Sequence, residues 1–214
     1  MSILSQFNPS ALAKKQLSRA FKEYSRAAKA AYLGEISAHS VNQHLVRGFT
    51  TSNTHKDTNH SVGQFLHHDY IMLSREDGKQ RYIITEVDLH ALHPYDHFFI
   101  LPNDLTEALF TEVLKRHVHH RHTPFSPDDG YLPAFKQRYS IFTRPEHFTQ
   151  SLRYVTPEVA KCIAEVKQSY LFEVHDTSLF VYDYSNQPVT EKTLAMQMRF
   201  ACTIATLLET QNRK

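Results

Sequence analysis

Residues 69–89, DYIMLSREDGKQRYIITEVDL, decide the fold predicted for this chain. Two runs rich in Tyr, Ile and Val, residues 69–73 and 81–89, flank a polar segment that contains Asp77-Gly78. Such residues favour strands, and an Asp-Gly pair between two strands favours a tight turn. The stretch therefore predicts an antiparallel β-hairpin in the middle of the chain.

Apolar residues spaced three and four positions apart predict helices elsewhere, and shorter aromatic and β-branched runs predict further strands. The third predicted helix has Thr156 as its cap and Pro157 in its first turn, which both favour a helix start. The predicted fold class is α+β: a mainly antiparallel sheet with an N-terminal helix and a C-terminal βαββα unit. The expected helices cover residues 11–33, 105–120, 157–168 and 189–208, the further strands cover residues 41–49, 96–101, 138–143, 170–175 and 178–184, and residues 50–61 and 123–133 are expected loops.

The composition is typical of a globular protein. The chain has 214 residues, of which 41% are hydrophobic and 21% are charged, enough to build one sizeable core. It has no run of about 18 apolar residues that could span a bilayer, and its first residues lack the pattern of a secretory signal. Cys162 and Cys202 lie in helix-like apolar patterns, which is typical of buried thiols in a reducing compartment.

These features predict a single soluble domain over residues 1–214, without a transmembrane segment and located in the cytoplasm. Residues 123–133 hold three prolines and one glycine, so an internal boundary is expected there if the chain divides.

Histidine is the unusual part of the composition, with 15 residues. The densest group is residues 116–122, RHVHHRH, in which His117 and His120 would share a helix face at a spacing of three. Imidazole is the commonest side-chain ligand of zinc and related ions, so this group indicates a metal site. The same pattern is also typical of polar residues that end a helix, where they complement its negative end.

A second ionisable group follows the predicted hairpin. Glu86, Asp88 and His90 alternate onto one face of a strand, and His93 and His97 come next. Such a face would present three ligands, or an acid–base pair, to a cleft. Alternation is equally typical of the solvent-facing side of an amphipathic strand.

The residues that the sequence singles out for a divalent metal ion are His117, His120, Asp88 and His90.

The first predicted helix carries a basic stripe. Up to residue 33 the chain has six basic residues and one acidic residue, a local charge of +5 in a chain with a formal net charge of +2. The stripe could contact nucleic-acid phosphates, lie on an anionic membrane, or form the solvated face of a packed helix. A dedicated nucleic-acid binder is usually more basic overall, which favours the solvated face. The stripe comprises Lys15, Arg19, Lys22, Arg26 and Lys29.

Several catalytic motifs are missing from the sequence. The five glycines are scattered, so there is no glycine-rich phosphate loop, and no Gly-x-Ser-x-Gly elbow occurs. The leading prediction is therefore a non-enzymatic binding or scaffold module that acts on a protein partner. The alternatives are a metal-dependent hydrolase that uses Asp88, His90 and residues 117–122, and nucleic-acid binding through the basic stripe.

The last third of the chain resembles a bacterial family of unknown function whose members are often encoded beside LemA-type membrane proteins. The resemblance lies in the apolar patterns of residues 135–143, 152–166 and 171–184. It implies a strand, a helix that opens after a Thr-Pro step, a strand hairpin and a closing helix, and it implies no catalytic residues. This chain lacks the transmembrane segments that many members of that family carry.

Overall fold

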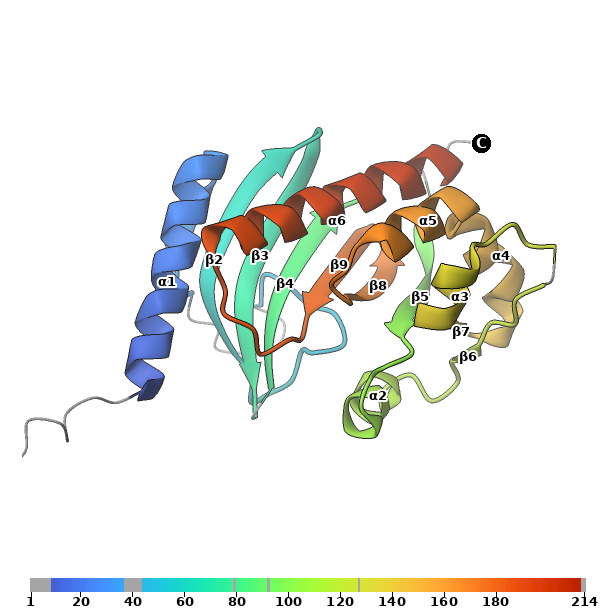
Figure 1. Cartoon of the computed structure of the whole chain (residues 1–214), viewed down its shortest axis with the longest axis horizontal. Coiled ribbons are helices and arrows are strands. Elements are labelled where there is room, and N and C mark those ends of the chain that lie inside the picture. Colours follow the sequence, from blue (N-terminus) through green and yellow to red (C-terminus); the bar gives the residue numbers. More distant parts are fainter. Residues whose placement is uncertain (1–8, 37–43, 79, 92, 127, 213–214) are drawn as a thin grey trace, which may run out of the picture.

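One nine-stranded antiparallel sheet organises the chain (Figure 1). The structure, a computed structural model, describes residues 9–36, 44–78, 80–91, 93–126 and 128–212. The order of the strands is β1-β2-β3-β4-β9-β8-β5-β7-β6. Their bounds are β1 Ala31–Gly34, β2 Lys56–Phe65, β3 His68–Asp77, β4 Gln80–Asp88, β5 Tyr95–Pro102, β6 Arg121–His122, β7 Tyr139–Thr143, β8 Leu171–Asp176 and β9 Ser178–Asp183.

Helices connect and cover these strands. In Figure 1, α6 runs across the sheet, with α1 beside one of its ends and α5, α4 and α3 beside the other. The bounds are α1 Pro9–Ala28, α2 Glu107–Leu114, α3 Pro133–Arg138, α4 Phe148–Tyr154, α5 Pro157–Glu165 and α6 Glu191–Asn212, with a short 3-10 helix, η3, at Pro145–His147. No helix in the described part of the chain is both long and apolar enough to cross a bilayer.

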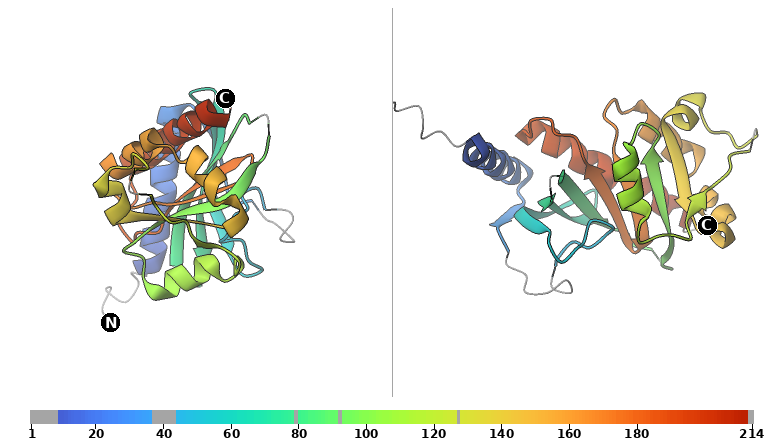
Figure 2. Two further views of the ribbon diagram at one scale, coloured as in Figure 1. Left: turned by 90° about the vertical axis from the view of Figure 1, so that its right-hand side faces the viewer. Right: turned by 90° about the horizontal axis from the view of Figure 1, so that it is seen from below.

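The sheet buries side chains on both of its faces. Along β5, Phe98 and Ile100 pack into a larger core with α1, α3, α4, α5 and α6, whereas Phe99 and Leu101 pack into a smaller core with α2 and residues 46–49. This alternation follows from the period of two of a strand. Figure 2 (left) shows α2 and α6 on opposite sides of the molecule. The smaller core is the side of the sheet that positions the histidines.

The predicted α+β class and the central hairpin are confirmed. Strands β3 and β4 pair antiparallel up to Asp77 and Gln80, and Gly78 adopts φ +59° in the connection. The C-terminal βαββα unit is also present as β7, α5, β8, β9 and α6, with Thr156 accepting a hydrogen bond from the Val159 amide at the start of α5. Helix α4 lies before α5 and had no signal of its own in the sequence.

The loop predicted for residues 50–61 is partly wrong, because β2 begins at Lys56. Its polar composition conceals a strand in which buried polar side chains are paired with residues of α1 and β1. The Ser61 hydroxyl lies 2.8 Å from that of Ser25, and Asn59 Oδ1 accepts from Tyr32 at 2.8 Å. Of the strand predicted for residues 41–49, residues 41–43 lie outside the described residues, and residues 44–49 form bends and turns.

Two predicted helices are shorter than expected. The N-terminal helix ends at Ala28, where Lys29 adopts φ +55°, and the chain continues as β1. The apolar spacing extended to Tyr32 because this strand residue packs beside the same core. The helix predicted for residues 105–120 ends at Leu114, and two turns follow it. Strands before and after residues 123–133 belong to the same sheet.

Candidate metal centre

His97 lies in β5, beside an irregularity in the strand. The register between β5 and β8 shifts between Tyr95 and Phe98, as in a β-bulge. A bulge interrupts the regular alternation of side chains, and Tyr95 accordingly packs into the same core as Phe98. His97 and Phe99 are two residues apart, so the regular alternation of the strand places both side chains on the α2 side of the sheet, with ring centroids 4.8 Å apart.

His117 and His120 come from the turns after α2. The His117 amide donates to the Leu114 carbonyl at 2.8 Å, and the His120 amide donates to the His117 carbonyl at 2.8 Å. These tight turns fold the chain back over β5. The ring centroids of His117 and His120 lie 4.4 and 4.9 Å from that of His97, and 5.1 Å from each other.

Three ring nitrogens converge at this point. One nitrogen from each of His97, His117 and His120 lies within 4.8 Å of the other two. The His120 side chain is buried, at 5% exposure, and neither of its ring nitrogens makes a hydrogen bond of normal geometry in the described part of the chain, although the His97 backbone lies close to the ring. A buried polar group without a partner costs free energy, so such groups are rare unless a ligand or water satisfies them.

Two of the three rings are held neutral. Burial, together with the positive charge that His97 can carry, lowers the pKa of His117 to about 4. Burial likewise lowers the pKa of His120 to about 4; the charges of His97 and His117 act in the same direction, and the nearby His97 backbone opposes them. Neutral imidazole is the form that binds metal ions, so both rings are in the ligating form at neutral pH.

A buried carboxylate supports the third ring. His97 Nε2 lies 3.1 Å from Glu173 Oε1, and Glu173 is only 3% exposed. Burial opposes ionisation of Glu173, but the hydrogen bonds from His97, the Tyr182 hydroxyl and the Phe49 amide outweigh it and hold its pKa below the ordinary value. If Nε2 of His97 donates to this carboxylate, Nδ1 is left unprotonated. Metal-bound histidines commonly have such a carboxylate partner.

The backbone closes over Glu173 at a glycine. Gly48 has φ +79°, and a Cβ at this position would overlap the Tyr182 hydroxyl and come within 2.9 Å of Glu173 Oε2. A residue with a side chain would be strained there and would displace the carboxylate. The glycine therefore lets residues 46–49 pack directly against the carboxylate behind His97.

A cavity of about 490 Å³ opens beside the three histidines. Besides them, charged and polar side chains line it: Asp96, Arg116, His119, Arg144, His147, His175 and Asp176. Neither Asp88 nor His90 is among its residues. The structure thus brings together His117 and His120 of the four predicted metal ligands.

Asp88 and His90 lie at a different place. Asp88 is the exposed last residue of β4. The His90 amide donates to Glu209 Oε1 of α6 at 2.7 Å, and its ring stacks on that of His68 with centroids 5.7 Å apart. These contacts place His90 on the α6 side of the sheet, whereas His117 and His120 pack with Phe99 on the α2 side.

A second group of potential ligands, His44, His55 and Asp57, has its ligand atoms within 4.8 Å of one another. However, both Asp57 oxygens accept from the buried Arg75 guanidinium, at 2.6 and 2.7 Å. His55 Nδ1 contacts the Ser52 backbone and its Nε2 lies 3.0 Å from His44 Nδ1. Both His55 nitrogens and both Asp57 oxygens already have protein partners, so the evident role of this group is to anchor residues 44–55.

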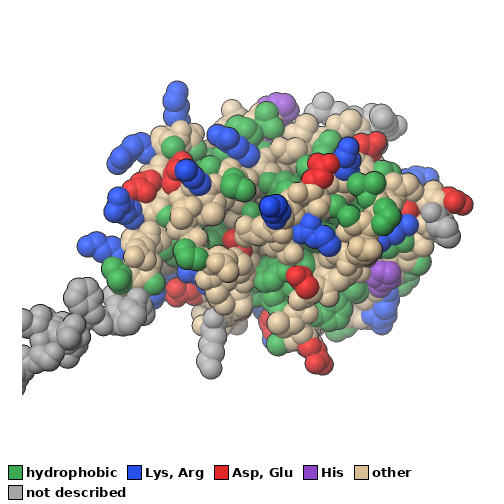
Figure 3. Space-filling view, viewed as in Figure 1, with side chains coloured by type: hydrophobic (Ala, Val, Ile, Leu, Met, Phe, Trp, Pro, Cys, Tyr) green, Lys and Arg blue, Asp and Glu red, His purple; other side chains and the backbone are tan. Residues whose placement is uncertain are grey.

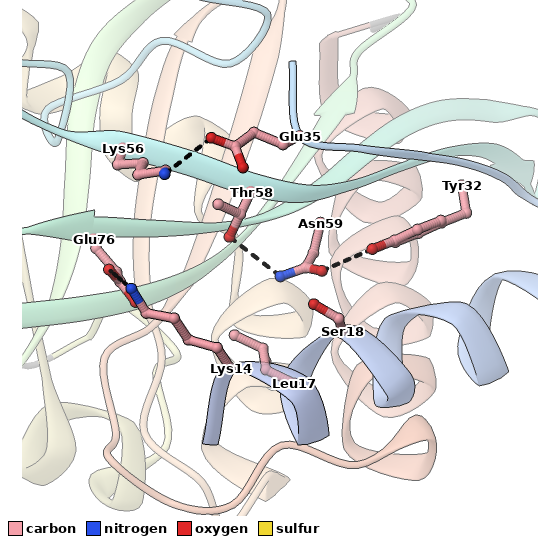
Figure 4. Close-up of a pocket in the computed structure, with 9 residues that line it drawn as sticks. All are labelled: Lys14, Leu17, Ser18, Tyr32, Glu35, Lys56, Thr58, Asn59 and Glu76. Atoms are coloured by element: carbon pink, nitrogen blue, oxygen red, sulfur yellow. Dashed lines mark hydrogen bonds and ion pairs between the residues drawn. The ribbon is translucent and has the colours of Figure 1, made fainter. Parts of the chain in front are cut away.

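A third possible site is the cleft of about 290 Å³ between α1 and strands β1–β3 (Figure 4). Its polar side chains pair across the cleft: Lys56 contacts Glu35 at 2.9 Å and Lys14 contacts Glu76 at 3.7 Å. Such exposed pairs are weak, but they leave few groups free for a ligand. The histidine cavity is therefore the stronger candidate.

The predicted basic stripe lies on the outer side of α1. Figure 3 shows Lys and Arg side chains gathered over this end of the molecule. Lys15, Lys22 and Arg26 are exposed, Arg19 pairs with Glu23 at 2.7 Å, and Lys29 follows the end of the helix. Nucleic-acid binding through this stripe stays a prediction.

Sequence reasoning missed Glu173. It is an acidic residue that stands between Phe172 and Val174 in the apolar part of the strand LFEVHD. A carboxylate at an expected core position is a signal of a buried polar site. His97 stood at the end of the second ionisable group, but nothing in the sequence joined it to His117 and His120.

Comparison with known proteins identifies a shared fold. The crystal structure of the mycobacterial trehalose monomycolate transport factor A, TtfA, is similar to this chain with a TM-score of 0.66 and 12% sequence identity, over 90% of this chain and 94% of that one. No family model and no curated protein matches the chain. The resemblance of the last third to a family encoded beside LemA-type proteins stays a prediction. At this identity the likeness to TtfA concerns the fold alone.

Proposed function

We propose that this chain is a non-enzymatic binding protein that holds one divalent transition-metal ion of the Zn²⁺ class through His97, His117 and His120. The observation that carries the proposal is the buried ring of His120, whose two nitrogens lack a partner while two further histidine rings face it. An ion at this point would satisfy the buried nitrogen. The similarity to a transport factor supports binding rather than catalysis as the role of this fold.

The ligand set favours some metals over others. Imidazole suits zinc, copper, nickel and iron, whereas calcium and magnesium prefer oxygen ligands. Zn–N bonds of about 2.0–2.1 Å put the nitrogens of a tetrahedral site about 3.3 Å apart. Metal binding would thus draw the three rings together from their present spread of up to 4.8 Å. Glu173 would orient His97 and stabilise the bound cation from behind.

The experiment is a metal measurement on protein made without a polyhistidine tag and without chelator. We expect about one zinc ion per chain by elemental analysis, in keeping with a three-histidine site. His117→Ala and His120→Ala should each lose the ion. His122→Ala is the matched control, because His122 belongs to the same histidine run but does not line the cavity. The absence of stoichiometric metal, or equal loss in the control, would refute the proposal.

The same samples distinguish simple metal binding from the alternative of a metal-dependent hydrolase. It requires metal-dependent turnover, and the predicted acid–base residues Asp88 and His90 do not line the cavity. We expect no hydrolysis of nitrophenyl esters or phosphates above that of free zinc. Turnover that is present in the metal-loaded chain and lost in His120→Ala would replace binding with hydrolysis as the function.

A further inference from the structure

A four-coordinate ion held by the three histidines would have one coordination position that they do not fill. The cavity of about 490 Å³ lies directly beside them, and it is lined by residues of β5, β8, η3 and the turns after α2. Zinc sites with three protein ligands keep their fourth position for water or another small ligand. The cavity volume falls in the range of sites that hold small molecules. A bound ion would therefore have an unfilled coordination position, and the cavity beside it has room for a ligand of several atoms.

The net charge around the cavity would change sign on binding a divalent metal ion. Leaving the histidines aside, the guanidinium groups of Arg116 and Arg144 stand against three carboxylates, those of Asp96, Asp176 and the adjacent Glu173. The metal-free site thus carries an excess of one negative charge, which attracts a cation. A bound divalent ion turns this into an excess of one positive charge. One monoanion would then neutralise the site.

Arg144 is the cation best placed to receive such an anion. It follows β7 and immediately precedes η3 at the edge of the cavity. Its side chain is exposed and has no hydrogen-bond or ion-pair partner within the described ranges, whereas Arg116 already donates to the Thr51 carbonyl. A planar guanidinium with free N–H groups matches a carboxylate in geometry and charge.

We propose that the metal-loaded cavity binds a small carboxylate, with one carboxylate oxygen on the open metal position and the group paired with Arg144. This inference rests on the proposed metal site and goes further, because it assigns the class of ligand and the order of binding. The metal comes first, since without it the cavity is negative. By linkage, the carboxylate in turn tightens metal binding by the same factor.

The test uses the full chain loaded with Co²⁺, whose visible spectrum reports its coordination, and acetate as the probe. Acetate should change the spectrum saturably, whereas chloride at equal ionic strength should not. Arg144→Gln should weaken acetate binding roughly tenfold, because a charge-assisted pair is lost. Arg153→Gln is the matched control: it removes one exposed arginine that does not line the cavity.

Each contrary outcome refutes a different claim. Bound Co²⁺ without a saturable acetate response, equal affinity in Arg144→Gln, or saturation by phosphate but not by acetate would overturn the carboxylate proposal while leaving the metal site intact. Failure of Co²⁺ to bind one-to-one would overturn the proposed function itself.

Discussion

Replacing His120 by leucine tests whether His120 is a metal ligand or a structural residue of the core. In metal-free protein the His120 ring is buried with both nitrogens unpaired. Leucine has a similar size and no polar atoms, so it removes the cost of these unpaired groups, about 1–3 kcal/mol. We expect the chelator-treated His120→Leu chain to be more stable than the original chain by about that amount, and to bind no metal.

The pH dependence of this gain follows from the pKa of His120, which burial lowers to about 4. Between pH 6.5 and pH 4 the unfolded chain binds more protons at this residue than the folded chain does. The original protein therefore loses stability as the pH falls through this window, by at most about 1.4 kcal/mol per pH unit. The leucine variant lacks this loss, so its advantage should grow toward pH 5.

The assay is urea unfolding followed by circular dichroism at pH 7.5 and pH 5, with chelator present and His122→Leu as the control. His122 is exposed in β6, so its replacement should change stability little at either pH. A His120→Leu chain that is clearly less stable than the original at both pH values would refute the reasoning. That result would mean that His120 is a satisfied structural residue.

Three further changes test the surroundings of the site. Glu173→Gln should weaken zinc binding about 10–100-fold in a chelator competition while His97 stays in place, because a carboxylate that accepts from a histidine ligand orients the ring and makes it a stronger ligand. Unchanged zinc affinity would exclude this role for Glu173. Arg75→Met should destabilise the chain by about 3–5 kcal/mol in urea unfolding, since it leaves the buried Asp57 carboxylate without its guanidinium partner. Adding Asp57→Asn should recover part of that loss, and strictly additive effects would contradict the pairing. Burial raises the pKa of Glu86 to about 7, so the free energy of unfolding falls as the pH rises from 4.5 to 7. Glu86→Gln should therefore be about 1–3 kcal/mol more stable than the original chain at pH 8 but not at pH 4. The same dependence of stability on pH in the variant and in the original chain would argue against this.

Local patterns were enough to predict much of the fold. The hairpin of β3 and β4 follows from alternating apolar residues and Asp77-Gly78, and α5 follows from Thr156-Pro157. Strand β2 could not be found in this way, because its buried side chains are polar and are satisfied by residues far away in sequence, such as Ser25. The early end of α1 depends on one residue, Lys29, in a left-handed conformation.

The candidate site was only half visible in the sequence for a similar reason. His117 and His120 are close in sequence, and their spacing suggested that they act together. Their partners depend on strand pairing: β5 and β8 place Phe99 opposite Glu173, and His97, two residues before Phe99, shares its face and reaches the same carboxylate. Such contacts arise from the register of strands about 75 residues apart, which spacing along the chain does not encode. Alternation along the strand grouped Asp88 with His90, but neither residue lines the histidine cavity.

X-ray absorption spectroscopy of the zinc-loaded chain tests the central claim most directly. A site made by His97, His117 and His120 predicts three nitrogen ligands at about 2.0–2.1 Å, with the outer-shell scattering of imidazole rings. His120→Ala should abolish this signal and His122→Ala should retain it. A first shell of oxygens alone, or a sulfur ligand from one of the free cysteines, would contradict the account.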